Sequence, residues 1–220
     1  MSAPSLCKPY RQLVAHYEEC LARFGDTPQG VDWPNSRDAQ TRYRIMTEVI
    51  RPEDRGGKVS LLDFGCGAAH LYEYLQAHGF GHISYSGLDL SEQFIRLSRS
   101  KFPHLTFYQL DLLGRQAEQV PDFDYIILNG VLTEKQNLTF DEMWDYAREL
   151  LIAVFRRARC GVAFNVMSKQ VDWERDDLFH LPMDLLAGFL TRELSRHFIF
   201  RSDYGLYEYT TYLYRAPASR

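Results

Sequence analysis

The sequence predicts an α/β fold: a doubly wound, seven-stranded, mostly parallel sheet whose last strand is antiparallel, with an N-terminal helical cap. Strand-like and helix-like segments alternate from residue 59 onward, which is typical of a sheet built from βαβ units. Two strand-like runs near the C-terminus are separated by only Gly205 and Leu206, a connection that joins only antiparallel strands. In 220 residues we expect one structural domain, with the cap over 1–58 and the sheet over 59–220.

The cap is predicted from two helical patterns separated by turn residues. Gly25 suits a C-cap after a stripe of apolar residues at helical spacing, formed by Leu13, Tyr17, Leu21 and Phe24. The turn-rich stretch GDTPQGVDWPNS follows, and Ser36 can then cap a second helix. The predicted inner face of that helix carries Ala39, Tyr43, Met46 and Ile50.

Strands and helices then alternate along the rest of the chain. The predicted strands span 59–64, 82–89, 105–111, 124–129, 161–167, 197–204 and 207–215. The predicted helices span about 68–78, 92–102, 140–157 and 183–195. Ser91 marks the start of the second of these helices, and a capping box of Thr139 and Glu142 marks the start of the third.

The stretch VSLLDFGCGAAH (59–70) has the outline of a ligand cradle. Its buried strand ends on Asp63, and Gly65 and Gly67 allow a sharp turn that a ligand can approach closely. The helix that follows points its first amide groups into the same space. Two cofactor classes suit such a turn. A dinucleotide would require a third glycine where the chain has His70, whereas S-adenosylmethionine would not.

The parts of S-adenosylmethionine find matching residues in the sequence. The ribose diol suits the carboxylate of Asp89, and the adenine suits an apolar slot with a polar edge formed by Asp111 and Leu112. The carboxylate of the methionine tail requires a cation, for which Arg42 is a candidate. Each role has a structural alternative: Asp89 as an acid at a helix N-terminus, Asp111 as a turn residue and Arg42 in a surface ion pair.

Four segments in order carry a resemblance to a known family. LLDFGCGAA, YSGLDLS, FYQLDLL and FDYIILNGVL resemble the successive cofactor-binding motifs of class I S-adenosylmethionine-dependent methyltransferases. The pair of strands at the C-terminus is also similar to that family, whose seven-stranded sheet ends on an antiparallel strand. The resemblance covers roughly 59–215. Ala69 stands where the family usually has glycine.

The resemblance implies a set of cofactor-binding residues. The first loop would consist of Asp63, Gly65, Cys66 and Gly67, with Asp89 on the ribose and Leu90 lining the adenine slot. Asp111 and Leu112 would flank the adenine, and Asn129 and Gly130 would lie beside the methyl donor at the entry to the acceptor site. The segment GVDWPNSRDAQTRY resembles the cap of small-molecule members, in which Trp33 and Arg42 would close over the methionine tail.

Residues for the transfer itself are harder to identify from sequence. Methyl transfer is an in-line displacement, so alignment supplies most of the rate, and a hydroxyl acceptor also benefits from a general base. His180, in a loop after the fifth strand, is the predicted base, with packing before Pro182 as the alternative. Asn129 is the second catalytic candidate. Further acceptor-pocket candidates are Lys135, Asn165, Tyr204 and Tyr207.

We therefore expect a methyltransferase that converts S-adenosyl-L-methionine to S-adenosyl-L-homocysteine. Its expected acceptor is a small polar metabolite, methylated at a hydroxyl of a sugar-like or natural-product molecule. The alternatives are N-methylation of a small amine, an NAD-type oxidoreductase and a cofactor-binding module without catalysis.

Composition sets the expected surroundings of the protein. A net charge of −4 gives no electrostatic footprint for nucleic acid. The sequence contains neither a signal-peptide pattern nor an apolar run of the roughly 20 residues that span a bilayer, so no membrane partner is expected. Four cysteines without CxxC pairing or metal-ligand spacing to histidine favour a reducing cytoplasm and no metal. A monomer or homodimer is expected.

Overall fold

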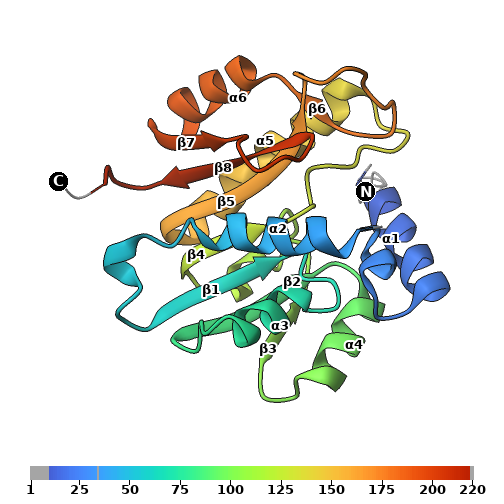
Figure 1. Cartoon of the computed structure of the whole chain (residues 1–220), viewed down its shortest axis with the longest axis vertical. Helices are drawn as coiled ribbons and strands as arrows, with labels where there is room; N and C mark the ends of the chain where they lie inside the picture. The colour runs from blue at the N-terminus through green and yellow to red at the C-terminus, as the bar shows by residue number, and fades with distance from the viewer. Residues whose placement is uncertain (1–9, 34, 219–220) are drawn as a thin grey trace, which may run out of the picture.

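The computed structural model describes residues 10–33 and 35–218 (Figure 1). The sheet contains eight strands: β1 (Val59–Phe64), β2 (Ile83–Asp89), β3 (Thr106–Gln109), β4 (Phe123–Leu128), β5 (Ala158–Ser168), β6 (His180–Leu181), β7 (His197–Arg201) and β8 (Glu208–Tyr214). The strand order is β3-β2-β1-β4-β5-β8-β7, with β6 paired to β5. Only the pairings of β8 with β5 and β7 are antiparallel. The predicted fold class is confirmed.

Helices cover the sheet and extend beyond one of its edges. They are α1 (Arg11–Phe24), α2 (Ser36–Thr47), α3 (His70–Ala77), α4 (Glu92–Lys101), α5 (Phe140–Arg157) and α6 (Met183–Phe189), with a short 3₁₀ helix η1 (Pro28–Val31) between α1 and α2. Figure 1 shows α1, in blue, beyond the carboxyl end of β1. In the described part of the chain, none of the helices has the length and apolar character required to cross a membrane.

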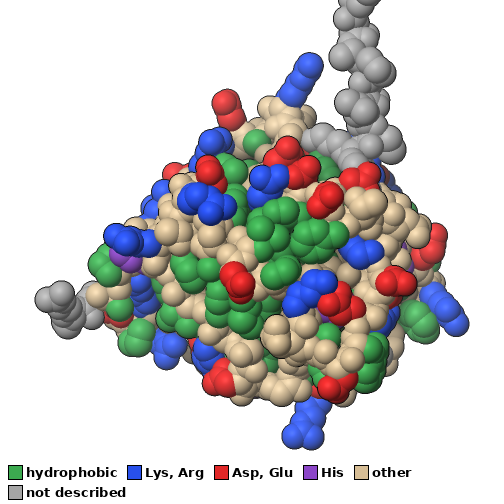
Figure 2. All heavy atoms as spheres, turned by 90° about the horizontal axis from the view of Figure 1, so that it is seen from above, with side chains coloured by type: hydrophobic (Ala, Val, Ile, Leu, Met, Phe, Trp, Pro, Cys, Tyr) green, Lys and Arg blue, Asp and Glu red, His purple; other side chains and the backbone are tan. Residues whose placement is uncertain are grey.

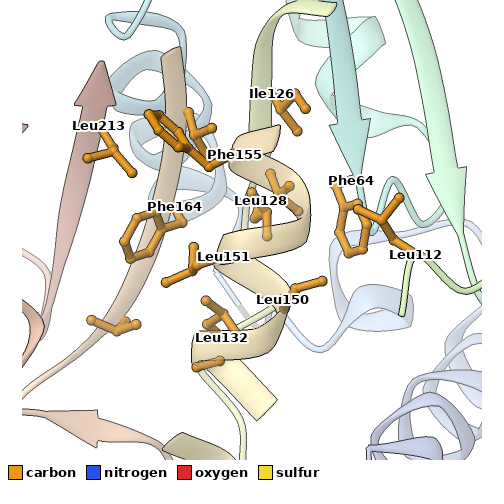
Figure 3. Close-up of a cluster of buried hydrophobic side chains, with 14 of the residues drawn as sticks. Phe64, Leu112, Ile126, Leu128, Leu132, Leu150, Leu151, Phe155, Phe164 and Leu213 are labelled. Carbon is orange, nitrogen blue, oxygen red and sulfur yellow. The ribbon is translucent and has the colours of Figure 1, made fainter. Parts of the chain in front are cut away.

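Side chains of alternate residues in the strands pack into separate cores on the two faces of the sheet. In β1, Leu62 and Phe64 belong to the core under α5, and Leu61 belongs to the core that also contains buried residues of α2 and α3. Figure 3 shows Leu150 and Leu151 of α5 near Leu128 and Phe164 of the sheet. All four residues predicted on the inner face of the second helix are buried: Ala39, Tyr43, Met46 and Ile50.

The local predictions hold in most places and differ in three. Thr139 and Glu142 form the predicted capping box, and Ser91 caps α4. However, the side chain of Asn35, rather than Ser36, caps α2. The predicted final helix changes into a π-helical turn at Leu190–Leu194, and β6 was not predicted because two residues carry no periodic signal. Residues 1–9 of the predicted cap lie outside the described residues.

The order of the strands indicates where along the carboxyl ends of the strands a ligand would bind. The sheet runs in one direction from β1 to β2 and β3, and in the other from β1 to β4 and β5. In open α/β sheets, ligands bind at the carboxyl ends of the strands where the order reverses, because adjacent crossovers leave on opposite faces there. The loops after β1 and β4 are therefore the expected walls of a site.

Replacement of Leu151 tests the core under α5. Leu151 is 2% exposed, so Leu151→Ala is expected to lower the free energy of unfolding by roughly 2–5 kcal/mol through lost burial and a cavity. Leu185 in α6 is 37% exposed, and Leu185→Ala is expected to change it by less than about 1 kcal/mol. Urea denaturation measures both. Equal losses would contradict this assignment of the core.

Candidate active site

One pocket lies at the predicted edge of the sheet. It contains about 980 Å³ of empty space, which includes the part open to solvent. Its walls come from α1, from the η1 segment (Val31 in η1 and Trp33 after it), from the turn after β1, from the end of β2 and from the turn after β4. Among the predicted residues, those that line it are Trp33, Asp63, Gly65, Cys66, Gly67, Asp89, Leu90, Asn129 and Gly130.

The turn after β1 requires glycine at two positions. Gly65 has φ +73° and Gly67 has φ +50°, both in the left-handed region. A Cβ on Gly65 would lie 2.5 Å from Cγ2 of Val131, and a Cβ on Gly67 would lie 3.2 Å from Cγ1 of Val31. Ala69 adopts the same backbone region at φ +59°, which accounts for glycine being usual there in the resembling family.

Asp89 joins the first turn to the end of β2. One carboxylate oxygen accepts a hydrogen bond from the backbone N–H of Gly67 at 2.9 Å, and the other accepts one from the N–H of Ser91 at 2.9 Å. Burial raises the pKa of Asp89, while these backbone donors oppose the increase. The carboxylate is thus held in one orientation on the pocket wall.

Asp63 is a second buried acid on the same wall. It is 3% exposed, and the hydroxyl of Tyr85 donates to its Oδ2 at 2.7 Å. Burial raises the pKa of Asp63 to about 7, with a contribution from the neighbouring charge of Asp89. The neighbouring Cys66 is a buried thiol whose pKa is raised by burial, so it is a packing residue rather than a nucleophile.

The turn after β4 presents a polar group without a protein partner. Both amide atoms of the Asn129 side chain are buried and have no hydrogen bond within the described residues. A buried amide without partners is costly, so this group is suited to a polar ligand in the pocket. Gly130 follows with φ +85°, and a Cβ there would lie 3.2 Å from the ring of Trp33.

Helix α1 covers the pocket and is fastened to it by three hydroxyl contacts. The Tyr10 hydroxyl, at the N-cap of α1, donates to Asp111 at 2.7 Å, and the Tyr17 hydroxyl donates to the carbonyl of Gly130 at 3.4 Å. The hydroxyl of Ser91 donates to Glu18 at 2.5 Å. These contacts reach the ends of three different strands, so α1 bridges the mouth of the pocket.

Three of the predicted cofactor-binding residues do not line the pocket. Leu112 is 5% exposed and packs in the core under α5, and Asp111 is held by Tyr10. Arg42 forms an ion pair with Glu208, at 2.9 Å between Nη2 and Oε2, and its guanidinium lies 5.3 Å from the centre of the Trp33 ring. These side chains are oriented by partners that are distant in sequence, and the local sequence does not reveal such partners.

The expectation that His180 is a general base is corrected by its contacts. His180 is 6% exposed and does not line the pocket. Its Nδ1 lies 2.6 Å from the carbonyl of Ser168, and its Nε2 accepts a hydrogen bond from the N–H of Arg175 at 3.2 Å. With both ring nitrogens engaged by backbone, this histidine holds the loop between β5 and β6 in place.

The other acceptor-pocket candidates also lie outside the pocket lining. The amine of Lys135 donates to the backbone carbonyls of Leu138 and Asp176, and the hydroxyl of Tyr204 lies 2.9 Å from that of Thr210. Tyr207 is 65% exposed. Asn165 is fully buried behind the pocket wall, where its side chain accepts a hydrogen bond from the backbone N–H of Gly130.

Sequence reasoning missed Glu134, a half-buried acid four residues beyond Gly130. Burial, together with the charges of Asp32 and Asp177, raises the pKa of Glu134 to about 7. Burial together with the charge of Glu134 raises the pKa of Tyr17, which lines the pocket. The signal was present in the sequence, because Glu134 closely follows the carboxyl end of a predicted strand.

A second missed feature lies between α1 and Asp32, the residue that follows η1. His16 and Cys20 are four residues apart on the helix, so the expectation that no cysteine has metal-ligand spacing to histidine was wrong. His16 Nε2 lies 2.9 Å from Oδ2 of Asp32 and 3.9 Å from Sγ of Cys20. The histidine and aspartate satisfy each other by this hydrogen bond, and we assign no metal to the group.

The raised pKa of Asp63 predicts how stability depends on pH. Unfolded aspartate titrates near pH 3.9, whereas the folded pKa is about 7, so the folded chain binds more protons between these values. The contribution of Asp63 to the free energy of unfolding is therefore complete below about pH 4 and is lost as the pH rises through 7. In Asp63→Asn, this decrease in the free energy of unfolding with pH, at most about 4 kcal/mol, is expected to disappear, as measured by urea denaturation at a series of pH values. An unchanged slope would contradict the raised pKa.

Comparisons with known proteins agree with this architecture. A family model described as "Methyltransferase domain" matches residues 62–153. A protein of Mycobacterium tuberculosis named "Putative methyltransferase Rv1506c" is 28% identical in a 162-residue alignment that covers 71% of this chain and 93% of that protein.

Two solved structures share the fold at low sequence identity. Magnesium protoporphyrin IX methyltransferase of Synechocystis, with bound S-adenosylmethionine, has a TM-score of 0.63 at 16% identity and covers 98% of this chain and 100% of that one. DesVI of Streptomyces venezuelae has a TM-score of 0.56 at 13% identity, over 82% and 92%. Residues 62–153 thus match a methyltransferase domain, and the chain shares its fold with solved S-adenosylmethionine-dependent methyltransferases.

Proposed function

We propose that this enzyme transfers the methyl group of S-adenosylmethionine to a hydroxyl of a small polar metabolite. The observation that carries the proposal is a single pocket in which the glycine turn, the carboxylate of Asp89 and the unpartnered amide of Asn129 lie on one wall. The glycine turn and the Asn129 amide match the polar amino-acid tail of the cofactor, and the carboxylate of Asp89 matches its ribose diol. An NAD-type oxidoreductase is not supported by the matched family.

The cofactor in this proposal lies along the carboxyl ends of β1, β2 and β4. Gly65 and Gly67 would hold the amino-acid tail, the amide of Asn129 would donate hydrogen bonds to it, and the carboxylate of Asp63 would pair with its ammonium group. Asp89 accepts from the ribose hydroxyls, beside the apolar wall that includes Leu90. Trp33 closes over Gly130. Asp111, the predicted neighbour of the adenine, does not line the pocket, and its carboxylate accepts a hydrogen bond from the hydroxyl of Tyr10.

A small acceptor is favoured by the covering of the pocket. Helix α1 and the η1 segment close over its mouth, which leaves little access for a polymer. On the face shown in Figure 2, Lys and Arg side chains are interspersed with Asp and Glu, unlike the single-sign surface that binds nucleic acid. Structural neighbours are named for different acceptors, magnesium protoporphyrin IX in one case and carbon in another, so acceptor identity does not follow from fold.

We assign Glu134 the role of general base in place of His180. A base with a pKa near the working pH is the most effective, and the pKa of Glu134 is about 7. Glu134 does not line the pocket itself: its carboxylate accepts a hydrogen bond from the side-chain amide of Gln136 at 2.9 Å, and its charge raises the pKa of Tyr17, which does line the pocket. N-methylation of a small amine is the second candidate, because an amine would react without this base once neutral.

The remaining expectations concern surroundings and assembly. Cys20, Cys66 and Cys160, the cysteines within the described residues, are free. This is compatible with the reducing cytoplasm that we propose as the place of action. Assembly as a monomer or homodimer remains a prediction.

Calorimetric titration tests the cofactor. S-adenosylhomocysteine is expected to bind the wild-type protein, and NAD is not. Asp89→Asn is expected to raise the Kd for S-adenosylhomocysteine at least about tenfold, or on the order of 1.4 kcal/mol, because the ribose loses a charged acceptor. Glu92→Gln, at an exposed acid three residues away, is the control and leaves the Kd unchanged. Binding of NAD alone would overturn the proposal.

Replacement of Glu134 separates hydroxyl from amine methylation. Glu134→Gln is expected to lower turnover roughly 100-fold, because the acceptor hydroxyl loses its base, while the Kd for S-adenosylhomocysteine stays the same. Glu174→Gln, at an exposed acid paired with Lys169, is the matched control. Mass spectrometry of a metabolite extract incubated with labelled methyl donor provides the acceptor for this measurement. Full turnover in Glu134→Gln would favour an amine.

A further inference from the structure

We propose that Arg42, Glu208 and Asn165 form a buried polar relay that fixes the Asn129–Gly130 turn, and that Glu208 is a positioning residue for the methionine tail. The proposal rests on the cofactor placement given above. None of the three side chains lines the pocket, so each acts through the turn rather than on the ligand.

The contacts of the relay are continuous from the cap helix to the pocket wall. The backbone N–H of Gly130 donates to Oδ1 of Asn165 at 2.8 Å, and Nδ2 of Asn165 donates to Oε1 of Glu208 at 3.0 Å. Nε of Arg42 then donates to both carboxylate oxygens of Glu208, at 3.1 and 2.9 Å. Every polar atom between the turn and the guanidinium therefore has a defined partner.

Burial makes the relay difficult to rearrange. Glu208 is 2% exposed and Asn165 is 0% exposed. A buried carboxylate is tolerated only when its charge is paired and its oxygens accept hydrogen bonds, and Arg42 and Asn165 supply both. Arg42 is therefore held by Glu208, which argues against the predicted direct contact between Arg42 and the methionine carboxylate.

The turn is held on two sides. Asn165 binds its backbone at Gly130, whose φ of +85° is a conformation that few residues adopt. The ring of Trp33 packs against the same glycine, and the guanidinium of Arg42 lies over that ring. Because Gly130 is fixed, the backbone of the preceding Asn129 is fixed as well; this residue lines the pocket, and its buried side-chain amide has no hydrogen-bond partner among the described residues.

The four residues come from distant parts of the chain. Arg42 lies on α2, Gly130 follows β4, Asn165 lies in β5 and Glu208 opens β8. The antiparallel β8 brings its first residue to the edge where the parallel strands end, opposite Met167 in the register with β5. The reversed direction of this strand is what places a carboxylate from the end of the chain behind the cofactor turn.

The test compares two ligands that differ in the tail. S-adenosylhomocysteine carries the amino-acid tail, and 5′-methylthioadenosine lacks it. Glu208→Gln is expected to raise the Kd for S-adenosylhomocysteine at least about tenfold and to change the Kd for 5′-methylthioadenosine by less than about twofold. Arg42→Lys, which retains the charge but not the bidentate geometry, is expected to show a smaller effect of the same kind. If the substitution only disturbed the fold, it would raise the Kd for both ligands equally, which would contradict the positioning role of Glu208.

The control is Glu48→Gln, because Glu48 also pairs with arginines, Arg44 and Arg201, but away from the pocket. If Glu208→Gln has the same Kd values for both ligands as Glu48→Gln, the relay is overturned while the methyltransferase assignment stands.

If Arg42→Lys raises the Kd for S-adenosylhomocysteine and Glu208→Gln does not, Arg42 binds the tail directly and the relay is again overturned. If the wild type binds neither ligand, the proposed function fails first. If Glu208→Gln does not fold, Arg42→Lys provides the test: the relay requires that this variant raise the Kd for S-adenosylhomocysteine more than the Kd for 5′-methylthioadenosine.

Discussion

The pocket depends on one hydrogen bond, in which the carboxylate of Asp89 accepts from the backbone N–H of Gly67. This bond ties the turn after β1 to the end of β2, and it is possible only because Gly65 and Gly67 adopt left-handed backbone angles. The N–H groups of Gly65 and Cys66 also donate to the carbonyl of Leu88, so two adjacent crossovers share one edge. The ligand-binding wall is therefore built mainly from backbone, and side chains orient it.

Much of the fold and part of the site could be predicted from the sequence. Gly65, Gly67 and Asp89 lie at fixed offsets from strands with a strong hydrophobic pattern, and such local signals locate both the turn and the acid that faces it. Asp63 was found for the same reason. The structure places all four on one pocket wall.

The rest of the site depends on partners that no local pattern reveals. Arg42 was expected to face the cofactor, but a carboxylate 166 residues away in sequence holds it. His180 was expected to face the strand ends, but backbone groups at the end of β5 and in the loop after it engage both ring nitrogens. In each case the residue type was informative and its orientation was not, because orientation is set by whichever buried group it satisfies.

The attachment of α1 has a consequence for how the active site opens. Leu13, at 7% exposed, is the one buried residue of this helix, and hydrogen bonds of Tyr10, Tyr17 and Glu18 connect the helix to the strand ends. Such a segment detaches at a lower free-energy cost than the sheet unfolds. Nucleoside exchange between turnovers can thus proceed by undocking of one helix, with the eight strands left intact.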